Sequence, residues 1–164
     1  MVEDIVRAMR HLMLGTRLKR IGERLQSDTQ TLIHGAGISI PTAQFPLLVA
    51  LHRFGPLNIG DLAGSLGISQ PGVTRMVRLL EASGLIRTAP LPEDQRIKTV
   101  ALTFEGEEMV TRSMEVLWPN VEAAVVDACA GFSESLLEQL GKLEDALDEA
   151  SLAKRAQHTG KDRT

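Results

Sequence analysis

Two short segments with the same apolar spacing stand on either side of a glycine, and they constrain the fold more than any other feature of the chain. The segments 59–66 and 69–83 each have apolar residues at positions i, i+3, i+4 and i+7, the spacing of an amphipathic helix. These residues are Ile59, Leu62, Ala63 and Leu66, then Val73, Met76, Val77 and Leu80. Gly67 suits the left-handed end of a helix, and Asn58 and Ser69 are good N-caps. The pattern predicts a helix-turn-helix.

A β-hairpin is predicted directly after the second of these helices. Gly84 ends the helix, and the β-prone runs "LIRTA" and "IKTVALT" follow on either side of the turn-rich, charged stretch "PLPEDQR". Two such runs around a short polar connection indicate antiparallel strands. The chain is therefore predicted to fold as mainly α with a small β-wing, which is a winged helix-turn-helix.

The second helix has hydrogen-bonding and cationic side chains on the face opposite its apolar stripe. That face presents Gln70, Thr74, Arg75 and Arg78. Pro71 costs little in the first turn, where backbone N–H groups lack helical partners, and Gly72 allows another backbone to come close. In the major groove of DNA, glutamine can pair with adenine, arginine with guanine or phosphate, and the methyl of threonine with that of thymine. We interpret this face as a DNA contact; the alternative for two arginines on any helix is a solvated face.

Two helices are predicted before this pair. Apolar residues recur at helical spacing over 4–34, which indicates one long helix, and "HGAGIS" at 34–39 ends it. A second helix should begin near Pro41–Thr42 and run to Phe54, since Pro46 falls close enough to its start to be tolerated.

Two more helices are predicted after the hairpin. Thr103 should cap a long helix through about Ala130, with a kink at Pro119. Ser133 should cap a last helix to about Ala150. Its leucines follow heptad-like steps, which indicate packing against a partner helix. These are Leu136, Leu140, Leu143 and Leu147. The polar tail 151–164 is expected to be disordered.

The net charge of −3 is unevenly distributed along the chain. Positions 36–100 contain six basic and four acidic residues, whereas positions 101–150 contain two basic and twelve acidic residues. A basic face in the middle of the chain is compatible with a polyanionic partner, and the late acidic segment should face solvent.

No apolar run is long enough to span a membrane, and the N-terminus lacks the features of a signal peptide. We expect a cytoplasmic protein.

Several other chemistries find little support in the residues. Cys129, the single cysteine, excludes an intrachain disulfide framework and has apolar neighbours, so we expect an inert, packed thiol rather than a redox sensor. The four histidines are far apart and include no i, i+4 pair, so no metal site is predicted. We find no nucleophile–base arrangement and no glycine-rich phosphate loop, so we predict neither an enzyme nor a cofactor.

Taken together, these motifs resemble the winged helix-turn-helix of the multiple-antibiotic-resistance regulator (MarR) family. The matching run is "LAGSLGISQPGVTRMVRLLEASGLIRTAPLPEDQRIKTVALTFEGEEM". It contains the "LGIS" turn, a recognition-like helix, the wing "PEDQR", a fixed step from Arg96 to "LT" at 102–103, and "EG" at 105–106 opening the next helix. The order of the predicted helices extends the resemblance over residues 4–150.

The resemblance implies a domain organisation. It implies a single MarR-like domain over 1–150, in which 36–103 form the DNA-binding lobe. The segments 4–34 and 104–150 would be the N- and C-terminal dimerisation helices.

The resemblance also implies which residues meet DNA. The recognition helix of the family enters the major groove, a role that falls here on Ser69, Gln70, Gly72, Thr74, Arg75 and Arg78. The wing element Asp-x-Arg corresponds to Asp94 and Arg96: the aspartate would brace arginines, and Arg96 would reach the minor groove or its phosphates.

The function implied is that of a dimeric transcriptional regulator, a repressor of a palindromic operator that a small-molecule effector releases. Members of the family often bind such an effector between the DNA-binding lobe and the dimerising helices. In this chain that cleft would be lined by Met13, Arg17, Phe45, His52 and Trp118, although ordinary core packing is the alternative for most of them. Two other functions stay open: a winged-helix module that binds an acidic protein, and the dimerising domain of an enzyme.

Overall fold

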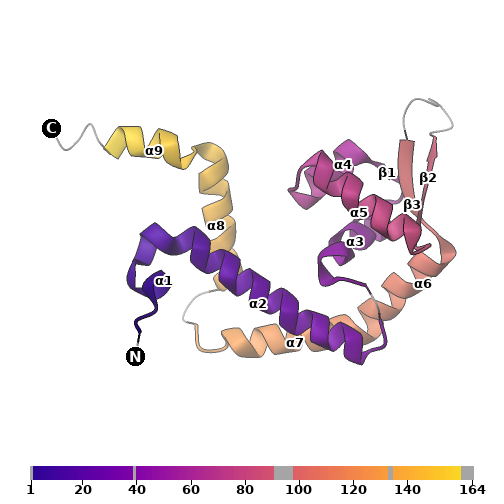
Figure 1. The fold of residues 1–164 in the computed structure, drawn as a ribbon, viewed down its shortest axis with the longest axis horizontal. Helices are drawn as coiled ribbons and strands as arrows, with labels where there is room; N and C mark the ends of the chain where they lie inside the picture. Colours follow the sequence, from indigo (N-terminus) through magenta and orange to yellow (C-terminus); the bar gives the residue numbers. More distant parts are fainter. Residues whose placement is uncertain (1, 39, 91–97, 133–134, 160–164) are drawn as a thin grey trace. The chain divides into compact units, whose positions relative to one another are not determined.

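The helix-turn-helix predicted from the apolar spacing is present in the structure, a computed structural model that describes residues 2–38, 40–90, 98–132 and 135–159 (Figure 1). Helix α4 spans Ile59–Leu66 and α5 spans Gln70–Ala82. The chain divides into two compact units, Met1–Val121 and Glu122–Thr164, each described by itself below.

The turn between α4 and α5 has the residues that its geometry requires. The Asn58 side chain accepts a hydrogen bond from the Asp61 N–H at 2.9 Å and so caps α4. Gly67 ends α4 with a φ of 63°, in the left-handed region that glycine adopts without a steric cost. Ser69 accepts from the Gly72 N–H and caps α5. All three roles confirm the sequence prediction.

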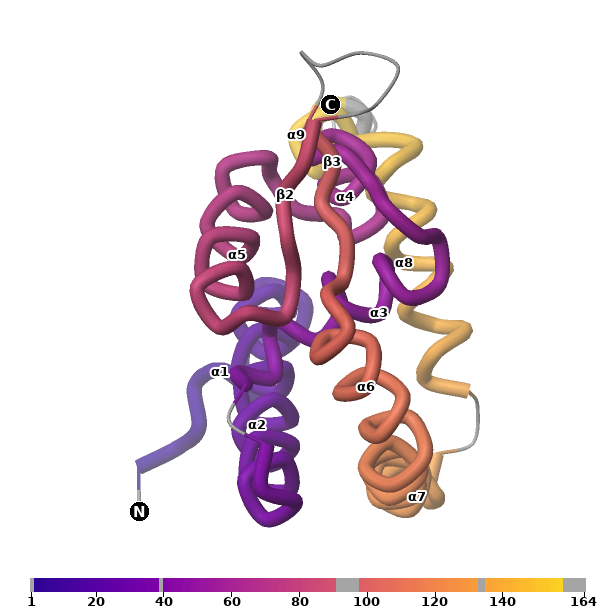
Figure 2. The backbone as a smooth tube through the Cα atoms, turned by 90° about the vertical axis from the view of Figure 1, so that its right-hand side faces the viewer, coloured from indigo at the N-terminus to yellow at the C-terminus, as the bar shows by residue number. Residues whose placement is uncertain are grey.

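The predicted hairpin belongs to a three-stranded antiparallel sheet. Strands β2 (Ile86–Pro90) and β3 (Lys98–Leu102) pair in the register Ile86↔Leu102, and Figure 2 shows them side by side near α5. A third strand, β1 (Leu57–Asn58), pairs with β3, so that the strand order is β1-β3-β2. Strand β1 was not predicted from the sequence, because two residues are too few to show a period of two. The wing tip, 91–97, lies outside the described residues.

The core of the lobe centres on α3 (Phe45–Phe54), which a 3₁₀ turn, η2 (Thr42–Gln44), precedes. This agrees with the predicted helix 41–54. Helix α3 packs against α4, α6 and β3. Apolar side chains from all these elements are buried together, including Leu47, Leu48, Leu62, Val73, Leu80, Ile86, Val100 and Val110.

The long N-terminal helix predicted over 4–34 is interrupted, which corrects that prediction. The structure has α1 (Ile5–Ala8), the 3₁₀ turn η1 (Arg10–Met13) and α2 (Leu14–Gly35). Arg10 has a φ of 46°, a left-handed conformation that no continuous α-helix contains. The helical spacing of apolar residues continues on both sides of this break, so periodicity alone did not reveal the break.

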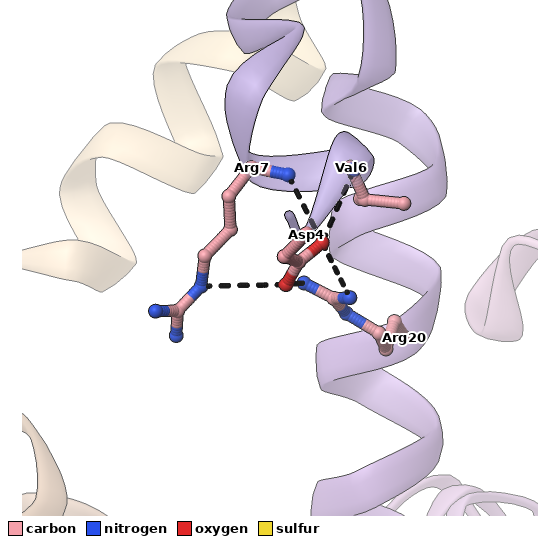
Figure 3. Close-up of polar contacts among 4 residues, drawn as sticks. All are labelled: Asp4, Val6, Arg7 and Arg20. Atoms are coloured by element: carbon pink, nitrogen blue, oxygen red, sulfur yellow. Dashed lines mark hydrogen bonds and ion pairs between the residues drawn. The ribbon is translucent and has the colours of Figure 1, made fainter. Parts of the chain in front are cut away.

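An ion pair accompanies the break. Asp4 caps α1 by accepting from the Val6 and Arg7 N–H groups, and it accepts from Arg20 of α2 at 3.2 and 3.1 Å (Figure 3). In a continuous helix, residues 4 and 20 would lie about 24 Å apart. The hydrogen bonds from Arg20 hold the pKa of the Asp4 carboxyl below its usual value.

The helix that Thr103 was predicted to cap is present but contains a wider turn. Thr103 accepts from the Gly106 N–H at 3.1 Å and begins α6 (Phe104–Arg112). A π-helical segment, η3 (Ser113–Leu117), leads into α7 (Trp118–Cys129). The irregularity lies before Pro119 rather than at it, because proline lacks the N–H that the carbonyl four residues earlier would accept.

The second unit contains the last two helices. Helix α8 (Leu136–Glu149) is capped by Ser135, whose side chain accepts from the Glu138 N–H. This corrects the prediction of Ser133 as the cap, and Ser133 itself lies outside the described residues. The expectation of a disordered tail over 151–164 is also corrected in part, since α9 spans Leu152–Thr159. Arg155 donates to the carbonyls of Ala146 and Ala150, which ties α9 to the end of α8.

Gly106 explains why "EG" opens the helix after the wing. A Cβ on this residue would lie 2.0 Å from the carbonyl oxygen of Leu85. The same carbonyl accepts from the Thr103 N–H at 3.0 Å, and the Thr103 hydroxyl donates to the Gly84 carbonyl at 2.7 Å. The start of α6 is thereby fixed against the turn between α5 and β2.

Replacing Gly106 with alanine should therefore destabilise the fold by about 3 kcal/mol, because the clashing atom belongs to the backbone and cannot rotate away. Gly64→Ala is the matched control: its Cβ would meet no atom of the described residues within 4 Å outside its own helix, and alanine should stabilise α4 by about 1 kcal/mol. Chemical denaturation of both variants measures this. Equal stabilities would contradict the packing assigned to Gly106.

Candidate nucleic-acid interface

The inner side of α5 determines which of its residues face outward. Val73, Val77 and Leu80 are 0%, 6% and 0% exposed, and they belong to the core of the lobe. Since a helix turns by about 100° per residue, the opposite side must present Pro71, Arg75 and Arg78 to solvent, and all three are exposed. This orientation agrees with the face predicted from the apolar stripe.

The outward face of α5 is slightly hollowed and positively charged. One hollow is lined by Gln70, Pro71, Thr74, Arg75, Arg78 and Leu79. Within the described part of the chain, no carboxylate lies within ion-pair distance of Arg75 or Arg78. Two guanidinium groups without a protein anion can pair with phosphate or with a guanine edge.

Three small residues near the start of α5 have distinct roles. The Ser69 oxygen caps the helix, and the hydroxyl of Thr74 donates to the Gln70 carbonyl at 2.9 Å. Gly72 has a helical backbone, and a Cβ there would lie 3.4 Å from Ser69 Oγ and 3.8 Å from Ile68 Cδ1. These are ordinary contacts, so the packing within the lobe does not require glycine at position 72.

Leu79 lines this hollow although it was not selected from the sequence. Its side chain is 51% exposed even though it is large and apolar. It falls outside the i, i+3, i+4, i+7 stripe, which is the signal that could have placed it on the outer face. The two wing residues predicted to meet DNA, Asp94 and Arg96, lie outside the described residues.

The predicted ligand cleft is assembled only in part. The rings of Phe45 and Trp118 meet edge to face, with centroids 6.2 Å apart, and Phe45 is 5% exposed within the core. His52 Nδ1 lies 2.6 Å from Glu107 Oε1, so it links α3 to α6. Met13 is half-buried at the end of η1 and Arg17 is exposed on α2.

A second hollow lies along the outside of α6, beside the connection between α2 and α3. It is lined by Gly37, Ile38, Phe104, Glu105, Glu107, Glu108, Met109, Thr111, Arg112 and Glu115. None of the five residues predicted to bind a ligand is among these. The four glutamates make it acidic, opposite in character to the hollow on α5.

Other kinds of site find no support in the described part of the chain. Among its residues, no group of three His, Cys, Asp or Glu side chains is placed to hold a metal ion. Cys129 is half-buried at the end of α7. No helix over the described ranges is both long and apolar enough to cross a membrane.

Comparison with known proteins agrees with this geometry. The model of the MarR family matches residues 40–98, the span of α3, the helix-turn-helix and most of the hairpin. A curated relative, the HTH-type transcriptional regulator FarR of Neisseria gonorrhoeae, is 26% identical over 142 residues, which cover 85% of this chain and 96% of FarR. Regulators from Bacillus species match over about half of their own length.

Solved structures share the fold. The transcriptional repressor CouR bound to a 23-mer DNA duplex aligns with a TM-score of 0.62 and 25% identity, covering 83% of this chain and 90% of CouR. BpsR of Bordetella bronchiseptica aligns with the same TM-score and 23% identity, covering 84% and 94% of the two chains. The resemblance seen in the motifs is thus confirmed: residues 40–98 match the MarR family, and the proteins that share the sequence or fold of this chain are transcriptional regulators.

Proposed function

We propose that this protein is a dimeric repressor that binds a palindromic operator through α5 and is released from it by a small-molecule effector. The observation that carries the proposal is the outward face of α5. Its inner side is fixed by burial, and its outer side presents Arg75 and Arg78, to which the described residues offer no ion-pair partner. CouR, which shares the fold, is a repressor whose structure holds a DNA duplex.

The first turn of α5 supports an approach to a DNA backbone. Gly72 and Pro71 leave little side chain there, and the positive end of the helix dipole attracts a phosphate. Since packing inside the lobe does not require glycine at position 72, an external surface is a physical reason for it.

An exposed apolar seam supports the dimer. Large apolar residues recur along α2 at steps of four, three, four and seven, and each is between 36% and 46% exposed: Leu14, Leu18, Ile21, Leu25 and Leu32. The leucines of α8 follow similar steps. Such a seam on a long helix is stable in water when a second helix covers it. A two-fold dimer would place two copies of α5 about 34 Å apart, in successive major grooves.

A small-molecule effector has a precedent among the proteins that share the fold. The DNA binding of BpsR is regulated by 6-hydroxynicotinic acid. A comparable ligand here would enter near Phe45, His52 and Trp118. Met13 and Arg17, also predicted to line the cleft, lie at the start of α2, whereas α2 contacts the lobe farther along, where Gln26 and Gln30 bond to Thr42. The alternative function, a module that binds an acidic protein through the same α5 face, is distinguished from DNA binding by its dependence on salt.

Removing one cation from α5 should change that dependence. We expect Arg78→Ala to weaken binding to a duplex containing the protein's own promoter, and to lower the slope of log K against log salt by about 1 for each subunit, because one phosphate contact is lost. Fluorescence anisotropy over a salt series measures both. Arg112→Ala, which removes an exposed arginine from α6, should leave the slope unchanged. A wild-type protein that binds this DNA with no salt dependence, or not at all at low salt, would contradict the proposal.

Gly72→Ala should separate stability from binding. The added methyl fits within the lobe, so the midpoint of unfolding should stay the same or rise slightly. DNA affinity should fall by about tenfold, the cost of displacing one charged hydrogen bond. Denaturation and anisotropy on the same sample test this, with Gly64→Ala as the control for DNA binding. Unchanged affinity would mean that no DNA strand approaches Gly72.

A charge placed in the α2 seam should abolish the dimer. Ile21→Glu puts a carboxylate among apolar side chains, where its desolvation is costly, so light scattering after gel filtration should give the mass of one chain. Ser27→Glu adds the same charge to the opposite side of α2 and should remain dimeric. If Ile21→Glu has the same mass as the wild type, α2 is not the dimer interface.

A further inference from the structure

The hydroxyl of Thr74 is already used inside α5. Its oxygen lies 2.9 Å from the carbonyl oxygen of Gln70, one turn earlier, and the hydroxyl proton is donated to that carbonyl. Thr74 nevertheless lines the hollow on the outward face of the helix, together with Gln70 and Arg78. A polar residue on the face proposed to read DNA therefore has no proton left for a base.

This lost donor limits what Thr74 can recognise. Threonine has one O–H donor, and the exposed acceptors of the major groove are guanine N7 and O6, adenine N7 and thymine O4. Thr74 in this geometry can satisfy none of them. What remains is a methyl group and the lone pairs of an oxygen that is held against the preceding turn.

The methyl group is the part of the side chain that is left for an outside contact. The β-branched side chain places oxygen and methyl on different branches of Cβ, and the hydrogen bond to Gln70 keeps the oxygen branch at the helix backbone. The apolar group that the major groove displays is the 5-methyl of thymine. We propose that Thr74 selects thymine at one position of each half-site through contact between the two methyl groups.

This inference rests on the proposed function, since it assigns a base to a residue of the DNA-reading helix. It goes further by stating which atom of the side chain carries the selection. The neighbouring groups fit that division: Gln70 and Arg78 have donors for base edges or phosphates, and Thr74 contributes apolar surface between them.

Two substitutions separate the methyl from the hydroxyl. Thr74→Val keeps a methyl and removes the oxygen, whereas Thr74→Ser keeps the hydroxyl, which can still donate to Gln70, and removes the methyl. Each protein, as the full chain, is used to select duplexes from a randomised DNA library. We expect the wild type and Thr74→Val to select thymine at the same position, and Thr74→Ser to accept other bases there. Thermal melts confirm that each variant is folded.

Modified DNA tests the same contact from the other side. Replacing thymine by uracil at that position of the selected duplex removes only the 5-methyl. Wild-type affinity should fall by about fourfold, the value of one buried methyl-sized group, and the affinity of Thr74→Ser should not change. Uracil at thymines elsewhere in the duplex is the control.

The outcomes distinguish the inference from the function on which it rests. Two results would contradict the methyl contact but leave the proposed function standing. In the first, the wild type selects a sequence, but uracil lowers its affinity no more than in the controls. In the second, Thr74→Ser still selects thymine and Thr74→Val does not. If no variant selects any sequence, the proposed function fails and the inference fails with it.

Discussion

The burial of one side of α5 is the constraint on which the rest of the interface depends. Val73, Val77 and Leu80 reach the core formed by α3, α4 and the sheet, and each buried aliphatic side chain stabilises this orientation by about 2 kcal/mol. A rotation of α5 about its own axis would expose them. The positions of Arg75 and Arg78 are therefore set by apolar packing on the far side of the helix, and no carboxylate of the described residues pairs with them.

In addition to the packing of α3 on α6, hydrogen bonds join the turn after α5 to the start of α6. Thr103 bonds to the turn after α5 in two ways, and Gly106 allows α6 to touch the Leu85 carbonyl. Because α5 ends and α6 begins at this junction, a tilt of α6 must be passed to α5 or must break these bonds. The absence of a Cβ at Gly106 is what allows this close contact.

Sequence patterns predicted the elements that are held by local rules. The helix-turn-helix followed from apolar spacing, from the caps at Asn58 and Ser69, and from the left-handed glycine at position 67. The elements that depend on long-range contacts were not predictable in this way. Strand β1 exists because β3 lies beside it, and the break at Arg10 accompanies an ion pair between residues sixteen positions apart. Asp94 and Arg96, which the family resemblance assigns to DNA contact, remain predictions.

Phe45 and Trp118, two of the residues predicted to line an effector cleft, pack against each other in this structure, and this has an energetic consequence. Phe45 is 5% exposed and meets Trp118 edge to face, a contact worth about 1 kcal/mol beyond its area. A ligand that inserts between the rings must replace this contact and also shift α3 relative to the start of α7. A ligand changes a conformational equilibrium only by the difference of its affinities for the two states. Opening of the Phe45–Trp118 contact would supply such a difference if the proposed effector binds there, because that ligand would bind the open state alone, and α3 packs directly on the helix-turn-helix.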